Sequence, residues 1–212
     1  GLSSWRPGKP GPWRAVSTSL KYGGYLSGYG LLSTLAKSAD SFLIGRFLGA
    51  VDLGLYTRAF SLVLFPVNQA LGPASTVAVP ALARAAATPE GLRAAFLRVY
   101  RLLIMAVVPS VAILIPAAAP VISLVLGNKW GEAVPVFAWL SPVALYVCMT
   151  KTTSWLFLAG GQTKELFHWS ILNSVLMIGA IGAAIHWGLV AVAASYAISG
   201  LLVRTPLLFW FA

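Results

Sequence analysis

Residues 102–127 have the sequence LLIMAVVPSVAILIPAAAPVISLVLG, which contains no charged residue. A helix needs about 20 consecutive apolar residues to cross the hydrocarbon core of a bilayer. This stretch is long enough, and five other stretches of the chain are comparably apolar. Hydrophobic residues make up 58% of the chain and charged residues only 9%, which is more hydrophobic and far less charged than a water-soluble domain. The composition therefore predicts an all-α membrane protein.

The six apolar stretches predict a bundle of six transmembrane helices. The connections between them are too short to hold a water-soluble domain. Residues 1–18 are expected to form a basic cytosolic linker, and residues 19–212 a membrane lobe. The chain starts at Gly1 and stops inside an apolar stretch, so we expect a fragment of a longer membrane protein. The expected spans are residues 19–49, 53–83, 96–127, 130–158, 166–187 and 189–211.

The basic residues are distributed unequally between the two ends of the predicted bundle. The end that carries the N-terminus holds Arg6, Lys9, Arg14, Lys21, Arg84, Arg93, Arg98, Arg101 and Lys164. The opposite end holds Arg46, Arg58 and Lys129. Because cytoplasmic loops of membrane proteins are enriched in Lys and Arg, the N-terminus is predicted to lie in the cytoplasm. With an even number of spans, the C-terminal end lies there too.

Several function classes are disfavoured by the residues themselves. The net charge is +10, but the basic residues form no face with interleaved aromatic residues, so we expect no nucleic-acid partner. The chain has no P-loop, no HExxH, no GxSxG and no paired carboxylates, which argues against an enzyme. Cys148 is the single cysteine, and no Cys/His spacing of a metal site is present. We therefore expect neither a metal nor a cofactor, apart from a coupling ion of unknown identity.

Charged residues inside the apolar stretches are the candidate ligand-binding residues, because charge at membrane depth is costly. Lys37 and Asp40 are three residues apart on the first predicted helix, so they share a face and could pair. Counted along the helices, none of these charges has to lie at the bilayer midplane, and snorkelling or structural ion pairing is the alternative reading. The functional reading is a weakly cationic cavity for an anionic passenger such as a diphosphate head group. Its candidate residues are Lys37, Asp40, Arg58, Lys151 and Arg204.

Proline and small residues mark local features of the predicted helices. Prolines can kink a helix, either harmlessly because neighbouring helices repair the backbone or because the kinked helix lines a cavity. Gly24 and Gly28 form a GxxxG pair, and Gly179 and Ala183 form a second small-xxx-small pair, both typical of close helix–helix contact. The internal prolines are Pro66, Pro73, Pro80, Pro109, Pro116, Pro120, Pro135 and Pro142.

Several segments, in order, resemble a known family. The pattern D-x3-IG-x3-G over residues 40–49 is followed by LGLY-x-x-A over 53–59. WRPG at 5–8 and LKYG at 20–23 precede them, and VAVPALAR at 77–84, LGNKW at 126–130 and LAGGQ at 158–162 follow. Together these segments resemble the bacterial polysaccharide-export flippases of the multidrug/oligosaccharidyl-lipid/polysaccharide exporter superfamily, and the likeness covers nearly the whole chain.

The resemblance implies a fold of two six-helix lobes around a central cavity, of which this chain resembles the C-terminal lobe. It also implies that the passenger is an undecaprenyl-diphosphate-linked oligosaccharide, flipped across the bacterial inner membrane by alternating access for surface polysaccharide or lipopolysaccharide biosynthesis. The implied partners are the lipid bilayer, the lipid-linked oligosaccharide and the missing N-terminal lobe. Two alternatives stay open: a related exporter of a drug or a cell-wall lipid precursor, and a membrane scaffold without transport.

Overall fold

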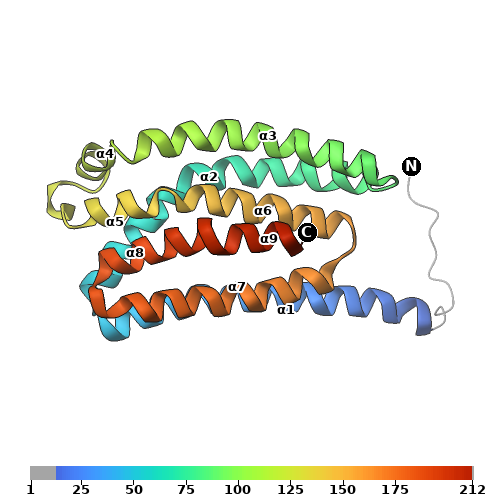
Figure 1. The fold of residues 1–212 in the computed structure, drawn as a ribbon, viewed down its shortest axis with the longest axis horizontal. Helices are drawn as coiled ribbons and strands as arrows, with labels where there is room; N and C mark the ends of the chain where they lie inside the picture. The colour runs from blue at the N-terminus through green and yellow to red at the C-terminus, as the bar shows by residue number, and fades with distance from the viewer. Residues whose placement is uncertain (1–12, 212) are drawn as a thin grey trace, which may run out of the picture.

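Helices run back and forth along one long axis in the computed structural model, which describes residues 13–211 (Figure 1). The apolar stretches of the sequence are helical. The helices are α1 (Trp13–Phe47), α2 (Ala50–Ala85), α3 (Pro89–Leu114), α4 (Ala118–Val125), α5 (Ala133–Leu140), α6 (Val143–Ala159), α7 (Thr163–Ala184), α8 (Leu189–Ile198) and α9 (Thr205–Phe211). Two 3₁₀ turns, η1 (Asn128–Trp130) and η2 (Ile185–Trp187), and a π-helical segment, η3 (Ser199–Arg204), connect some of them. Residues 1–12 of the expected linker lie outside the described residues, and residues 13–18 belong to α1.

Within residues 13–211, five helical segments are long and apolar enough to cross a membrane. They are α2, α3, the α5–α6 segment, the α7–η2 segment and the α8–α9 segment. α1 is not one of them, although it packs lengthwise against α7, because its polar residues include Lys21, Lys37, Asp40 and Arg46. The expectation of six spans is therefore supported by length and composition for five.

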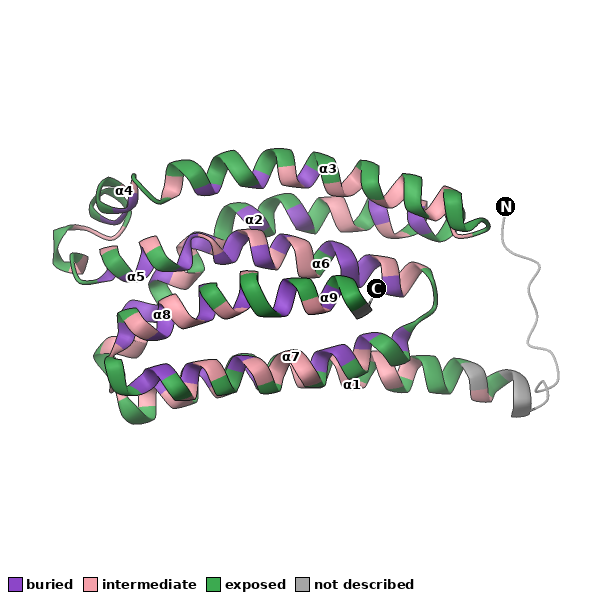
Figure 2. Ribbon diagram, in the orientation of Figure 1, coloured by how far each residue is buried: buried purple, intermediate pink, exposed green. Residues whose placement is uncertain are grey.

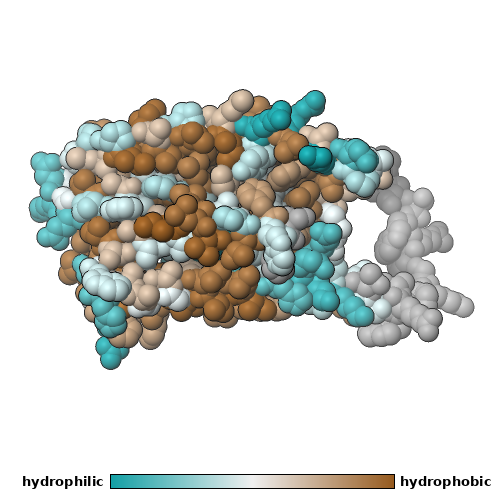
Figure 3. Space-filling model, in the orientation of Figure 1, coloured by the Kyte–Doolittle hydropathy of each residue, from teal (hydrophilic) through white to brown (hydrophobic). Residues whose placement is uncertain are grey.

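The connections fall at two opposite ends of the bundle. The α2–α3 turn and the α6–α7 loop lie at the same end as the start of α1 and the end of α9 (Figure 1). The α1–α2 turn, helix α4 and the α7–α8 connection lie at the other end. In Figure 3 an apolar zone covers the middle of the visible face and hydrophilic residues gather at its two ends, as a bilayer requires.

The surface of the bundle is apolar where a soluble protein would be polar. Figure 2 shows buried residues concentrated on the inner helices and exposed residues over most of α3. Only 17% of the spanning part of α3 is buried inside the protein, and only 22% of that of α2. A soluble bundle would place its apolar residues in the core, so lipid is the solvent that suits these exposed faces. The core itself contains fully buried side chains such as Ile44, Phe137 and Ile181.

Proline divides two of the expected spans. The stretch 96–127 is broken after Leu114, next to Pro116, and continues as the short helix α4. The stretch 130–158 is broken between α5 and α6, where Pro142 precedes the first turn of α6. Pro66, Pro73 and Pro80, by contrast, lie inside α2 without ending it. A proline in an apolar stretch of this chain therefore does not by itself end the helix.

The two small-residue pairs were expected to mark close helix contacts, and the structure supports this for one glycine. A Cβ built on Gly28 would lie 2.7 Å from Cε2 of Phe167 on α7. Among the described residues, one built on Gly24 or Gly179 would meet no atom within 4 Å outside the nearby backbone of its own helix. The rotation of α1 about its axis places Gly28 under the Phe167 ring, which also contacts Tyr25 with ring centroids 5.8 Å apart. The expectation is therefore wrong for Gly24 and Gly179.

Gly24 and Gly28 of α1 provide a matched test of the α1–α7 contact. We expect Gly28→Leu to destabilise the protein by about 1–3 kcal/mol, because the new side chain must displace the Phe167 ring from a packed position. Gly24→Leu should leave the stability unchanged or raise it by up to about 1 kcal/mol, since its position is open and leucine is the better helix former. Unfolding in a detergent titration, followed by circular dichroism, measures both. Equal effects of the two substitutions would show that α1 does not pack on α7 in this register.

Candidate functional site

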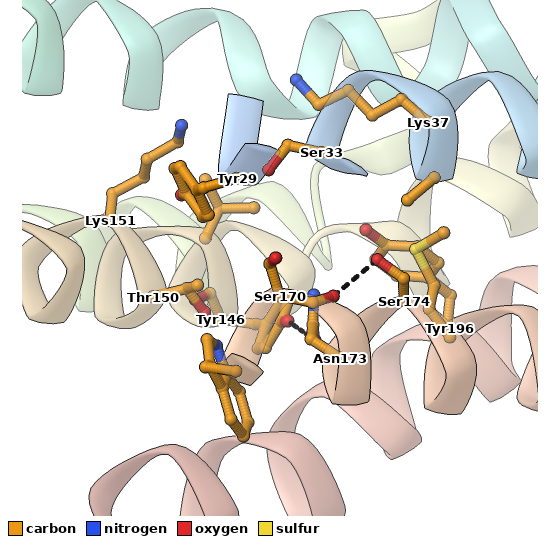
Figure 4. Close-up of a pocket in the computed structure, with 14 residues that line it drawn as sticks. Tyr29, Ser33, Lys37, Tyr146, Thr150, Lys151, Ser170, Asn173, Ser174 and Tyr196 are labelled. Carbon is orange, nitrogen blue, oxygen red and sulfur yellow. Dashed lines mark hydrogen bonds between the residues drawn. The ribbon is translucent and has the colours of Figure 1, made fainter. Parts of the chain in front are cut away.

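A polar cavity of about 130 Å³ lies among α1, α6, α7 and α8. We call it the polar cavity. Asn173, one of its lining residues, lies near the middle of α7, about 15 Å from either end of the helix at 1.5 Å per residue. The cavity is therefore at mid-depth in the bundle. Figure 4 labels its polar lining as Tyr29, Ser33 and Lys37 of α1, Tyr146, Thr150 and Lys151 of α6, Ser170, Asn173 and Ser174 of α7, and Tyr196 of α8.

The hydroxyl groups around the cavity are held by their own helices. Thr150 donates to the carbonyl of Tyr146 at 2.9 Å, and Ser174 donates to the carbonyl of Ser170 at 2.7 Å. Such bonds to the preceding turn satisfy the hydroxyl proton inside an apolar helix. Tyr146 spans between helices instead, because its hydroxyl donates to Oδ1 of Asn173 (Figure 4). The polar lining is thus fixed in place by hydrogen bonds within and between helices.

Arg204 lies behind the wall of this cavity and is fully buried. Its guanidinium lies over the ring of Tyr146, 4.4 Å from the centroid, and over the ring of Tyr196 at 4.8 Å. Nη2 donates to the carbonyl of Tyr196 at 3.0 Å, and Nη1 approaches Oδ1 of Asn173 at 3.5 Å. In the described part of the chain no carboxylate lies within 4.0 Å of it. Arg204 therefore does not snorkel, as one sequence-based reading allowed, and its charge stays inside the lobe.

The backbone around Arg204 explains how a guanidinium fits there. Arg204 ends the π-helical segment η3. Thr205, the first residue of α9, donates its hydroxyl to the carbonyl of Gly200 at 2.8 Å. A Cβ on Gly200 would lie 3.1 Å from Cγ of Tyr146 and 3.2 Å from Nη2 of Arg204. The missing side chain of Gly200 leaves the space that the guanidinium and the Tyr146 ring share. π-Helical turns of this kind often occur at functional sites.

Lys37 and Lys151 both line the polar cavity, and both are exposed. In Figure 4 their ammonium groups lie on the same side of the cavity. Each can donate hydrogen bonds but accept none, so they bias the cavity toward anions. Together with the buried charge of Arg204, they place three of the five candidate residues around one cavity.

Asp40 and Arg58 lie elsewhere. Asp40 is buried and lines a neighbouring hollow of about 400 Å³ between α1 and α2, which Lys37 also lines. The pairing of Asp40 with Lys37 is not formed as an ion pair in residues 13–211, and Asp40 instead accepts a hydrogen bond from the Ser41 hydroxyl at 3.1 Å. Arg58 is exposed on α2 and lines neither hollow.

Sequence reasoning missed the uncharged residues that hold Arg204. Tyr146, Asn173 and Tyr196 are uncharged residues on three different helices, and no motif spacing connects them. Asn173 carried a usable signal, because an amide near the centre of a charge-free stretch needs a partner in the membrane. Tyr146 and Tyr196 carried none, since tyrosines are common in membrane helices.

Comparison with known proteins gives a family and a fold. Residues 1–135 match the family described as "Polysaccharide biosynthesis protein". The chain is 29% identical over 197 residues to the teichuronic acid biosynthesis protein TuaB of Bacillus subtilis (strain 168), covering 92% of this chain and 40% of TuaB. It is 30% identical over 209 residues to the amylovoran biosynthesis protein AmsL of Erwinia amylovora, covering 96% and 53%. It is 26% identical over 182 residues to the lipopolysaccharide biosynthesis protein WzxC of Escherichia coli (strain K12), covering 85% and 37%.

The fold is that of half a MATE protein. The crystal structure of a MATE point mutant superposes with a TM-score of 0.76 at 18% identity, covering 100% of this chain and 48% of that one. MATE in the straight conformation gives a TM-score of 0.72 with the same coverage. This chain therefore spans about half the length of the proteins that it matches, in sequence and in structure.

Proposed function

This chain belongs to the polysaccharide biosynthesis protein family, a family of transporters and not of enzymes, and we propose that it is one lobe of a flippase for lipid-linked oligosaccharides. The family resemblance drawn from the segments between residues 5 and 162 is confirmed at this level. In the proposed function, the two-lobed protein moves an undecaprenyl-diphosphate-linked oligosaccharide across the bacterial inner membrane by alternating access. The passenger then serves surface polysaccharide biosynthesis.

The observation that carries the proposal is the charge of the polar cavity. Lys37 and Lys151 line it, and Arg204 lies buried behind it without a carboxylate partner in the described residues. A cavity at mid-depth in a membrane lobe gains nothing from unpaired cations unless an anion enters it. A diphosphate carries the charge and the acceptor oxygens that these donors lack, and an oligosaccharide supplies hydroxyls for the surrounding Tyr, Ser and Asn side chains.

The proposed arrangement in the membrane uses α1 as a sixth span. α1 packs along α7 and contributes Lys37 to the polar cavity, so the cavity is complete only if α1 lies at membrane depth. The start of α1, the α2–α3 turn and the α6–α7 loop lie at one end of the bundle, and this end carries most of the basic residues. The positive-inside rule favours the cytoplasm for that end. The missing half of the protein would close the cavity from the open side.

Complementation tests the function directly. The full-length protein, expressed in a bacterial strain that lacks the flippase of its own surface polysaccharide, is expected to restore the polysaccharide at the cell surface. Surface labelling with a lectin or an antibody measures it, and an empty vector is the control. If the protein reaches the membrane in normal amounts but restores no polysaccharide in the strain whose oligosaccharide it should carry, the proposed function is wrong and a scaffold or another passenger replaces it.

A further inference from the structure

Helix α3 has an inward face and an outward face of different chemistry. On the inward face Phe96 stacks on Tyr100 with centroids 5.6 Å apart, and Tyr100 meets Phe209 of α9 edge-on at 6.3 Å. Leu103 and Val107 are buried on the same side. The outward face carries a shallow groove lined by Ala94, Leu97, Arg98, Arg101, Leu102 and Met105. This face points away from α2 and α6, against which α3 makes its main contacts.

Placing α3 across the hydrocarbon core puts the two arginines of this groove near the head groups at the α2–α3 end. α3 has 26 residues, or about 39 Å, whereas the hydrocarbon core is about 30 Å thick. With Leu114 at the outer boundary of the hydrocarbon, the inner boundary falls near Ala94. Arg98 and Arg101 then lie about 6 and 10 Å inside it at 1.5 Å per residue. A helical side chain points back toward the helix N-terminus, so both guanidinium groups can extend toward the head groups at the α2–α3 end.

Neither arginine is neutralised by the protein. Arg98 and Arg101 are exposed, and their guanidinium groups have neither a hydrogen-bonding nor a carboxylate partner in residues 13–211. Residues three apart on a helix share a face, so the two charges act on the same small volume. An unpaired pair of cations at the edge of the hydrocarbon is unfavourable until an anion joins it, and a phosphate accepts bidentate bonds from arginine.

We propose that Arg98 and Arg101 bind the phosphate of an anionic phospholipid in the leaflet at the α2–α3 end. The groove favours a lipid over a free anion because its remaining surface is apolar and exposed. Leu102 is 65% and Met105 71% exposed, and Val108 and Ile113 continue the exposed apolar surface deeper along α3. A phosphate at the arginines places its acyl chain along these residues. The site is independent of the passenger and of the polar cavity.

Lipid binding by the full-length protein tests this site. Native mass spectrometry in mild detergent, with dioleoylphosphatidylglycerol or dioleoylphosphatidylcholine added, counts the lipids that each variant retains. We expect Arg98→Gln with Arg101→Gln to weaken phosphatidylglycerol binding by about tenfold or more, because each arginine near the surface attracts an anionic lipid. Phosphatidylcholine binding should differ much less between the parent and this groove variant, because its choline offsets the charge of its phosphate. The matched control is Arg84→Gln with Arg93→Gln, which removes two exposed cations from the same end but outside the groove.

The outcomes separate the sources of the phosphate. Undiminished phosphatidylglycerol binding in the groove variant, or an equal loss in the control variant, would overturn the proposal. Inorganic phosphate is the third probe. If it displaces phosphatidylglycerol at millimolar concentration, the groove is a free-anion site and the proposal of a lipid site is wrong. All four arginines are exposed, so we expect every variant to keep the elution volume and helical content of the parent.

Discussion

Replacing Arg204 by Ala is expected to lower the free energy of unfolding by about 3 kcal/mol, whereas the same change at Arg58 should leave it unchanged. The guanidinium of Arg204 contacts two tyrosine rings, and such a contact contributes from about 0.5 kcal/mol at an exposed site to about 2 kcal/mol where water is excluded. Its hydrogen bond to the Tyr196 carbonyl is charge-assisted and adds about 1.5–3 kcal/mol. Removing a buried charge regains part of this sum, because the cation no longer needs to be desolvated.

Unfolding of both variants in detergent measures this difference. Arg58 is exposed and makes no contact with the polar cavity, so it controls for the loss of one positive charge from the lobe. Arg204→Lys is the informative third variant: it keeps the charge but loses the flat guanidinium that fits between the rings of Tyr146 and Tyr196. We expect it to lie between the parent and Arg204→Ala. A variant Arg204→Ala as stable as the parent would show that the two rings do not hold the guanidinium.

The helical membrane fold could be predicted from the sequence because its signal is local. Apolar stretches such as residues 102–127 need no knowledge of their neighbours to predict a span. Pro116 and Pro142 were likewise predicted as possible kinks from the sequence alone, because a proline removes a backbone donor wherever it stands. What local patterns could not predict was which of the marked prolines end a helix. That depends on how the surrounding chain packs.

The site was predictable as a set of charges but not as an arrangement. Lys37, Lys151 and Arg204 are far apart in sequence. Only the packing of the helices brings the two lysines to the lining of one cavity and Arg204 of η3 behind its wall. Counting residues along a helix gives depth but not rotation, so it could not show that Arg204 points into the lobe while Arg58 points out. The same missing rotation explains why Gly24 and Gly28, identical in pattern, differ in contact.

Changing Lys37 and Lys151 to Gln together is expected to reduce export by about a hundredfold. Each ammonium group that faces a phosphate at contact distance contributes a few kcal/mol at an effective dielectric constant of about 20, and solvent at the open cavity reduces this to about a tenfold effect per charge.

Arg58→Gln with Lys129→Gln removes two exposed charges that do not line the cavity, and this control variant should export normally. The complementation strain is grown at an expression level at which the amount of transporter limits export. Surface polysaccharide per cell then measures the rate of export. Because Lys37 and Lys151 are exposed, their loss should not affect folding, so a deficit in export with normal protein levels reports on the passenger. Equal export by the two double variants would mean that the cavity charges do not hold the passenger, even if the protein itself restores polysaccharide.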